Sequence, residues 1–188
     1  MRLEGIADTC FLVDWVHYRN RDKLFELFDR IFITEGVLKE IGYEPTISWV
    51  SSKLAEGKIA LLTESPSVSS EAYTLMSLSR GEPRMRDLDY PEAVCLVLGK
   101  MLRAIVLTEN RAAVMAPFFL EPYSGVIVWR SLEVLREFIL RGYIVLEHKT
   151  EESIRRVFEE YMSDTRHLFS TTELNSVVRA ILKCVRRR

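Results

Sequence analysis

The sequence predicts an α/β fold with a three-layer arrangement, in which a short parallel sheet of about four to five strands is flanked by helices. Two observations carry this prediction. Short apolar runs of strand length recur along the chain, and they alternate with longer segments of helical spacing. The 188 residues are 48% hydrophobic and 28% charged, which is enough for one domain with a full core and an extension.

The first half of the chain supplies three predicted strands. The opening strand lies in the apolar run 5–13, which Asp8 interrupts, and the next two cover 30–33 and 58–63. Gly42 and Pro45 break the pattern after the second strand, because proline disfavours helical geometry in the residue before it. The intervening predicted helices cover 21–28, a short segment that ends at Glu40, 46–56 and 71–78.

The second half continues the alternation and then becomes wholly helical. Pro91 suits the first turn of a helix over 91–103, after an exposed loop at 79–90. Strands are predicted at 105–108 and 126–129, with a helix over 131–141 that ends near Gly142. Helices over 151–162 and 171–185 follow. We therefore divide the chain into an α/β domain, 1–147, and a C-terminal helical extension, 148–188.

Composition narrows the class of protein. No apolar stretch reaches the ~20 residues of a membrane-spanning helix and no signal segment opens the chain, so a cytoplasmic protein without a membrane partner is expected. Cys10, Cys95 and Cys184 are an odd set, which predicts reduced thiols. Three histidines and no Cys-x-x-Cys pair argue against zinc, so oxygen atoms would hold any catalytic metal.

Acidic side chains far apart in the sequence each lie at the edge of a short apolar run. They are Asp8, Glu40, Glu92 and the pair Glu109-Asn110. Open α/β sheets bind ligands beyond the carboxyl ends of their strands, where such residues can meet. Carboxylate oxygens are the ligands that Mg²⁺ and Mn²⁺ prefer. The pattern therefore predicts a divalent-metal site, in which the N-terminal turn of its helix should keep Glu92 ionised.

Four segments in order resemble the motifs of PIN-domain nucleases, most closely the prokaryotic branch that includes the VapC-like toxins. The similarity covers about residues 4–146. Its motifs are Asp8-Thr9 before Phe11-Leu12-Val13, residues 27–33 leading into Val37-x-x-Glu40-Ile41, Asp89-Tyr90-Pro91-Glu92-Ala93, and Val106-Leu107-Thr108-Glu109-Asn110-Arg111.

The resemblance implies a metal-dependent endoribonuclease that cleaves RNA by metal-activated water. Mg²⁺ or Mn²⁺ would be held by Asp8, Glu40, Glu92 and Asn110, and Glu109 joins these as a catalytic candidate. The family commonly has aspartate where Asn110 stands, which weakens a second ion site. The resemblance also implies a toxin role, a small antitoxin partner and a homodimer.

Other residues near these motifs have candidate supporting roles. The hydroxyls of Thr9 and Thr108 could orient a carboxylate, or could satisfy backbone groups at strand ends. Asp14, Asp87 and Asp89 are alternative acids that do not match the motif positions. The C-terminus is basic, and four arginines near the motifs are candidate RNA contacts, although solvated surface charge explains both features equally well. The four are Arg80, Arg84, Arg86 and Arg111.

Two other functions remain open at this stage. Asn110 is compatible with a catalytically degenerate PIN-like domain that binds RNA or protein. A DNA-directed nuclease or a metal phosphatase on a similar scaffold would differ only in substrate, because no base-reading motif is visible.

Overall fold

A five-stranded parallel sheet with the strand order β3-β2-β1-β4-β5 forms the centre of the molecule. The computed structural model describes residues 3–186. The strands are β1 (Leu3–Ala7), β2 (Phe28–Thr34), β3 (Ile59–Leu62), β4 (Ile105–Leu107) and β5 (Val128–Trp129). In the register, Ile6 is paired with Phe32 of β2 and with Val106 of β4. The predicted α/β class with a short parallel sheet is confirmed.

Helices connect the strands and continue beyond the last one. Their bounds are α1 (Thr9–Trp15), α2 (Leu24–Leu27), α3 (Glu35–Glu40), α4 (Glu44–Ala55), α5 (Pro66–Arg80), α6 (Tyr90–Leu102), α7 (Arg111–Phe119), α8 (Ser131–Arg141), α9 (Glu151–Thr165) and α10 (Thr171–Arg186), with short 3-10 turns at Arg21–Lys23 and Glu121–Tyr123.

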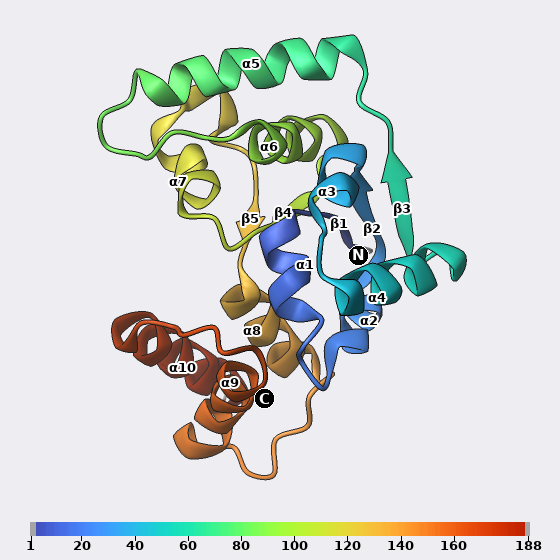
Figure 1. Cartoon of the computed structure of the whole chain (residues 1–188). Coiled ribbons are helices and arrows are strands. Elements are labelled where there is room, and N and C mark those ends of the chain that lie inside the picture. Colours follow the sequence, from blue (N-terminus) through green and yellow to red (C-terminus); the bar gives the residue numbers. More distant parts are fainter. Residues whose placement is uncertain (1–2, 187–188) are drawn as a thin grey trace.

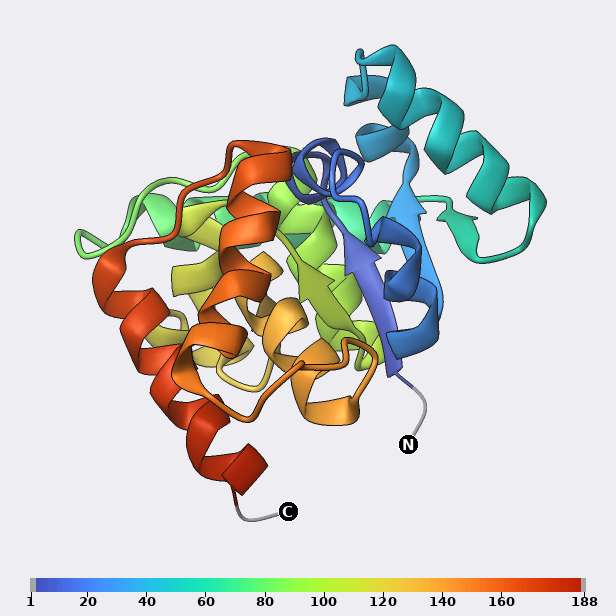
Figure 2. The same ribbon diagram turned by 90° about the horizontal axis from the view of Figure 1, so that it is seen from below.

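The helices form layers on both faces of the sheet (Figure 1). On one face, α6 packs against β1 and β4, and α5 packs on α6. On the other face, α2 packs against β2 and α8, and α9 and α10 pack on α8. Figure 2 shows α9 and α10 as the outermost elements of this second face. The sheet is therefore enclosed by helices, as parallel sheets usually are.

A glycine sets the distance between α6 and the sheet. The buried residues of α6 run almost without interruption from Glu92 to Gly99. A Cβ atom on Gly99 would overlap the Cγ2 atom of Val106 in β4. The absence of a side chain thus lets α6, which carries Glu92 at its start, lie directly on β4.

The helical extension shares the core of the α/β domain. Tyr161 of α9 is fully buried, and its ring lies 5.4 Å from that of Trp15 in α1 and 5.2 Å from that of Tyr18. Trp15 in turn stacks on Phe11 and meets Phe138 of α8 edge-on. Aromatic pairs at these distances add to the stability gained from burial. No helix within residues 3–186 has the length and apolar character needed to cross a bilayer.

The structure corrects the predicted opening of the chain. The apolar run 5–13 is not one strand: β1 ends at Ala7, and Phe11 and Leu12 belong to α1. Asp8 is therefore the N-cap of α1 at the end of the strand, and does not interrupt a strand. Helix α7 was not predicted, and α5 is longer than the predicted 71–78 because Ser65 caps it and Pro66 begins it.

Candidate active site

Asp8 is buried at the carboxyl end of the central strand. Only 4% of its surface is exposed. Its Oδ1 atom accepts a hydrogen bond from the backbone N–H of Thr9 at 2.7 Å. Its Oδ2 atom accepts from Thr108 Oγ1 at 2.9 Å and from the Cys10 thiol at 3.1 Å. Each of these donors is neutral, so the carboxylate is held in place without a compensating cation.

Glu92 enters the same region from the first turn of α6. Its Oε2 atom accepts from the backbone N–H of Asp89 at 3.1 Å, which completes a capping box, and its Oε1 atom accepts from Asn110 Nδ2. Burial, followed by the negative charges of Asp8, Asp89 and Glu40, raises the pKa of Glu92 to about 7. The expectation that the helix terminus keeps Glu92 ionised is therefore not met, because burial and the neighbouring charges outweigh the helix dipole.

Glu40, at the last turn of α3, is the exposed member of this group. Thr34 caps α3 through a hydrogen bond to the N–H of Val37, which places Glu40 beyond the end of β2. The Oε2 atom of Glu40 accepts from Thr9 Oγ1 at 2.7 Å. Thr9 and Thr108 thus each donate a hydroxyl hydrogen bond to one of the predicted acids, and Thr108 Oγ1 also accepts one from the backbone N–H of Asn110 at 3.0 Å.

The side-chain amide of Asn110 forms hydrogen bonds through both its oxygen and its nitrogen. Its Oδ1 atom accepts from the backbone N–H of Ala112 at 2.7 Å and caps α7, while its Nδ2 atom donates to Glu92. The oxygen that would coordinate a metal is therefore occupied by the helix terminus. Asn110 lies beside Glu92 but, in this orientation, acts as a hydrogen-bond donor to it.

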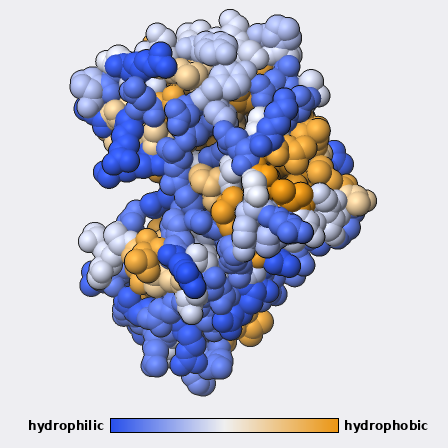
Figure 3. Space-filling view, in the orientation of Figure 1, coloured by the Kyte–Doolittle hydropathy of each residue, from blue (hydrophilic) through white to orange (hydrophobic). Residues whose placement is uncertain are grey.

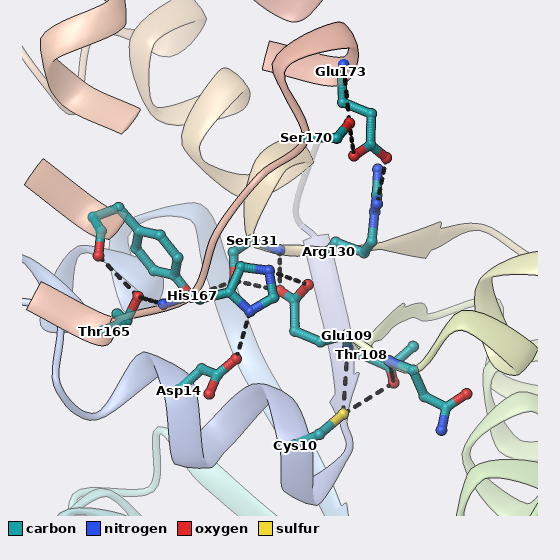
Figure 4. Close-up of polar contacts among 12 residues, drawn as sticks. Cys10, Asp14, Thr108, Glu109, Arg130, Ser131, Thr165, His167, Ser170 and Glu173 are labelled. Carbon is teal, nitrogen blue, oxygen red and sulfur yellow. Dashed lines mark hydrogen bonds and ion pairs between the residues drawn. The ribbon is translucent and has the colours of Figure 1, made fainter. Parts of the chain in front are cut away.

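Glu109 points away from Asp8 and Glu92. Its Oε1 atom accepts from the backbone N–H of Ser131 at 2.7 Å and from the Ser131 hydroxyl (Figure 4). Its Oε2 atom lies 3.4 Å from Nε2 of His167. Burial raises the pKa of Glu109, although the Ser131 hydrogen bonds and the positive charge of His167 act in the opposite direction.

His167, from the segment between α9 and α10, joins Glu109 to Asp14 of α1. Its Nδ1 atom is 2.8 Å from Oδ2 of Asp14 (Figure 4). The Asp14 hydrogen bond raises the pKa of His167 more than burial lowers it. Tyr161 completes the group through its hydroxyl, 2.6 Å from that of Ser131. Sequence reasoning missed His167, Ser131 and Tyr161, because no spacing signal relates these residues to α1.

The chemistry of the Asp8, Glu40 and Glu92 oxygens suits a hard divalent cation. Within residues 3–186, however, no three side chains of His, Cys, Asp or Glu form a set that could hold a metal ion as they stand. Glu40 and Glu92 each direct an oxygen at a side-chain donor, Thr9 and Asn110 respectively. These two acids would have to turn from those donors to share an ion with Asp8.

The four predicted RNA-contact arginines are exposed, but they are not equivalent. Arg84 is paired with Glu82 at 2.6 Å and lies over the ring of Phe119. Arg80 ends α5 and Arg86 lies in the following loop, while Arg111 begins α7 directly after Asn110. Arg111 is thus the arginine attached to the loop that carries Thr108 and Asn110.

Comparisons with known proteins give similarity to solved structures. No family model matches the chain, and no curated protein sequence matches it. A solved structure of VapBC2 from Rickettsia felis, bound to a DNA fragment from its promoter, is similar with a TM-score of 0.49 and 12% sequence identity. The match covers 68% of this chain and 98% of that chain.

Proposed function

We propose that the chain is a PIN-type, divalent-metal-dependent endoribonuclease whose site is built from Asp8, Glu40 and Glu92. The observation that supports this most is a negative charge without an internal counter-charge. In the part of the chain that the structure describes, none of the three acids forms an ion pair, and Asp8 and Glu40 raise the pKa of Glu92. Such a group binds an external cation favourably.

In this proposal, Asp8, Glu40 and Glu92 hold Mg²⁺ or Mn²⁺, and the bound ion would activate a water for attack on the phosphodiester and stabilise the leaving oxygen. The chain itself positions the acids. Thr108 and Cys10 fix one oxygen of Asp8, and Thr9 orients Glu40. Glu92 would have to be ionised to hold the cation, and Arg111 would contact a phosphate next to the one that is cleaved.

The test is cleavage of a labelled structured RNA by the purified protein with Mn²⁺ and with EDTA. We expect Mn²⁺-dependent cutting that is lost in Asp8→Asn and retained in Asp87→Asn, a matched change at an exposed acid of the loop before α6. Full activity in Asp8→Asn would overturn the assignment.

Thermal melting tests the metal site without requiring the right RNA. At a Mn²⁺ concentration of about 100 times its Kd, binding to the folded state would add about 2.7 kcal/mol to the free energy of unfolding. We expect this increase in the wild type and in Asp87→Asn, and its loss in Asp8→Asn.

The resemblance of the sequence motifs to VapC-like toxins supports a toxin role with a small antitoxin partner, and a homodimer. Mass photometry of the purified chain would test the homodimer.

One observation favours a second function, a catalytically degenerate module that binds RNA or protein. Asn110 donates to Glu92 and uses its oxygen to cap α7, while Glu109 is held by Ser131 and His167. No fourth carboxylate therefore joins the group from the loop after β4. A crystal soaked in Mn²⁺ separates the two functions, because density for an ion between Asp8 and Glu92 supports the nuclease and its absence supports the module.

A further inference from the structure

The outer face of α10 carries a row of cations that form no ion pair within residues 3–186. Arg179, Lys183 and Arg186 are exposed and recur at four- and three-residue spacing, which places them on one side of the helix. Residues 174–186 contain no Asp or Glu. Within the described residues, no carboxylate pairs with any of the three. This row is called the α10 basic row below.

Basic residues near α10, by contrast, form ion pairs. Arg130 is paired with Glu173 at 2.7 Å, and Arg155 with Glu151 at 3.0 Å. The helix dipole accounts for cations in the last turn, Lys183 and Arg186, but its effect ends before Arg179. The α10 basic row therefore has no ion-pair partner in the part of the chain that the structure describes, and the helix dipole does not explain all of it.

We propose that the α10 basic row binds the phosphate backbone of RNA outside the nuclease site; this inference rests on the proposed function for the identity of the nucleic acid. The row extends from Arg179 to Arg186, seven steps along the helix, or about 10 Å at about 1.5 Å per residue. In duplex DNA each strand presents a phosphate about every 3.4 Å along the axis, so the row is long enough to contact about two to three backbone phosphates.

The surroundings of the row favour a phosphate backbone over a lipid surface. Polar side chains of Thr172, Asn175 and Ser176 line the same groove as the three cations, and they can hydrogen-bond to phosphate or ribose oxygens. Ala180 and Leu182 complete the lining and leave little apolar surface for a bilayer compared with the buried face of the helix. Membrane-surface helices instead expose an apolar face. In α10 that face, which contains Leu174, Val178 and Ile181, is buried against the rest of the protein.

The position of α10 determines which part of an RNA it would contact. Figure 2 shows α10 running from the side of the sheet where the strands end toward the opposite side. In Figure 3, a notch separates the lobe that contains α10 from the lobe of α5 and α7, and hydrophilic side chains line much of both its sides. The row would thus hold nucleotides beyond those at Asp8, and it would matter for long RNAs but not for short ones.

The test measures binding separately from cleavage, with Asp8→Asn protein in EDTA. Fluorescence anisotropy compares labelled single-stranded RNAs of about 30 and about four nucleotides. In Arg179→Ala/Lys183→Ala, we expect about tenfold weaker binding of the long RNA and a salt dependence reduced by about 1.4 in log–log slope, which is about 0.7 for each lost phosphate contact. Binding of the short RNA should not change.

Lys58→Ala/Lys149→Ala is the matched control, because it removes two exposed cations elsewhere. Equal long-RNA affinity and slope in the α10 variant and this control, at matched melting temperatures, would overturn the inference. Stronger binding of the row to anionic vesicles than to RNA would do the same. If wild-type protein cuts no RNA but the α10 variant still loses long-RNA binding, the nuclease proposal fails and the α10 basic row stands.

Discussion

Two groups of carboxylates lie near the same edge of the sheet, and they differ in what neutralises them. Asp8, Glu40 and Glu92 are contacted by hydroxyl, thiol, amide and backbone donors. Asp14 and Glu109 instead share the imidazole of His167. A carboxylate group with its own cation is complete, whereas one with neutral donors only is attractive to an external cation. The comparison is consistent with the function proposed for the first group and predicts a structural role for the second.

The largest expected difference is in activity, between Asp8→Asn and Asp14→Asn. Asp8→Asn should lower metal-dependent cleavage about 10³-fold, which corresponds to about 4 kcal/mol of transition-state stabilisation. Asp14→Asn should leave the cleavage rate within about threefold, because its partner is His167 and not the proposed ion. Both are measured as kcat/KM on the same labelled RNA, with circular dichroism spectra to verify folding. Equal losses in the two variants would remove the distinction between the groups.

The second expected difference is in stability. His167→Ala should lower the free energy of unfolding by about 2 kcal/mol, because it leaves the buried Glu109 and the partly exposed Asp14 without their shared cation. Urea unfolding at pH 6 measures this change. His148→Ala is the control, since His148 is exposed. An unchanged urea midpoint in His167→Ala would show that the second group contributes nothing to stability.

The pH dependence of stability in the absence of metal also distinguishes the two groups of carboxylates. The pKa of Glu92 is about 7 in the folded protein against 4.5 ordinarily, so the folded state retains a proton that the unfolded state releases. Stability should therefore fall as pH rises from about 4.5 to 7, by about 2 kcal/mol, and Glu92→Gln should remove this part of the slope. The raised pKa of His167 gives stability below pH 6.5 that is lost above it, and His167→Ala should remove that part.

Urea unfolding in EDTA at several pH values measures both slopes. Saturating Mn²⁺ should reverse the Glu92 effect, because the ion binds the ionised form and adds stability as pH rises. A slope in Glu92→Gln identical to that of the wild type would mean that Glu92 ionises normally, and that Asp8 does not affect it.

The smallest expected effect concerns Cys10, which connects the two groups. Its thiol donates to Asp8 and accepts from the backbone N–H of Glu109 at 3.3 Å. Burial and the charge of Asp8 raise the pKa of the thiol to about 12, so it should stay protonated and react slowly with iodoacetamide, while the exposed Cys184 reacts readily. Peptide mapping after alkylation at pH 8 measures the two rates.

Replacement of the thiol should have a small effect. Cys10→Ser retains a donor to Asp8 and should change stability by less than about 1 kcal/mol. A thiol at Cys10 that is alkylated as fast as Cys184 would show that the Asp8 contact is broken in solution.

Local sequence patterns predicted the fold class and the approximate places of the acids, because each signal lies within a few residues. Pro91 placed the start of α6 and hence Glu92 near the N-terminus of a buried helix. The directions in which the side chains of Glu109 and Asn110 point could not be predicted from such local patterns. Whether Glu109 or Asn110 faces Glu92 depends on Ser131 and on the capping of α7, and α7 carries no strong periodic signal.

The group formed by Asp14, Glu109 and His167 could not be predicted from local sequence patterns. His167 and Asp14 are 153 positions apart in the sequence, and they meet only because Tyr161 docks α9 onto Trp15. The same limit explains the error at the opening strand. Apolar residues on both sides of Asp8 are equally compatible with a strand and with a buried helix, and the choice depends on what covers α1 in the folded protein.

The strand order has a consequence for the synthesis of the protein on the ribosome. The central strand β1 is made first, yet its neighbour β4 begins at Ile105, and Thr108 lies 100 positions after its hydrogen-bond partner Asp8. More than half of the chain must therefore emerge before the edge of β1 that faces β4 is paired. Until then, β1 exposes an apolar, unpaired edge, and a nascent fragment that stops before β4 lacks Thr108, the hydrogen-bond donor to Asp8, and is a natural target for chaperones.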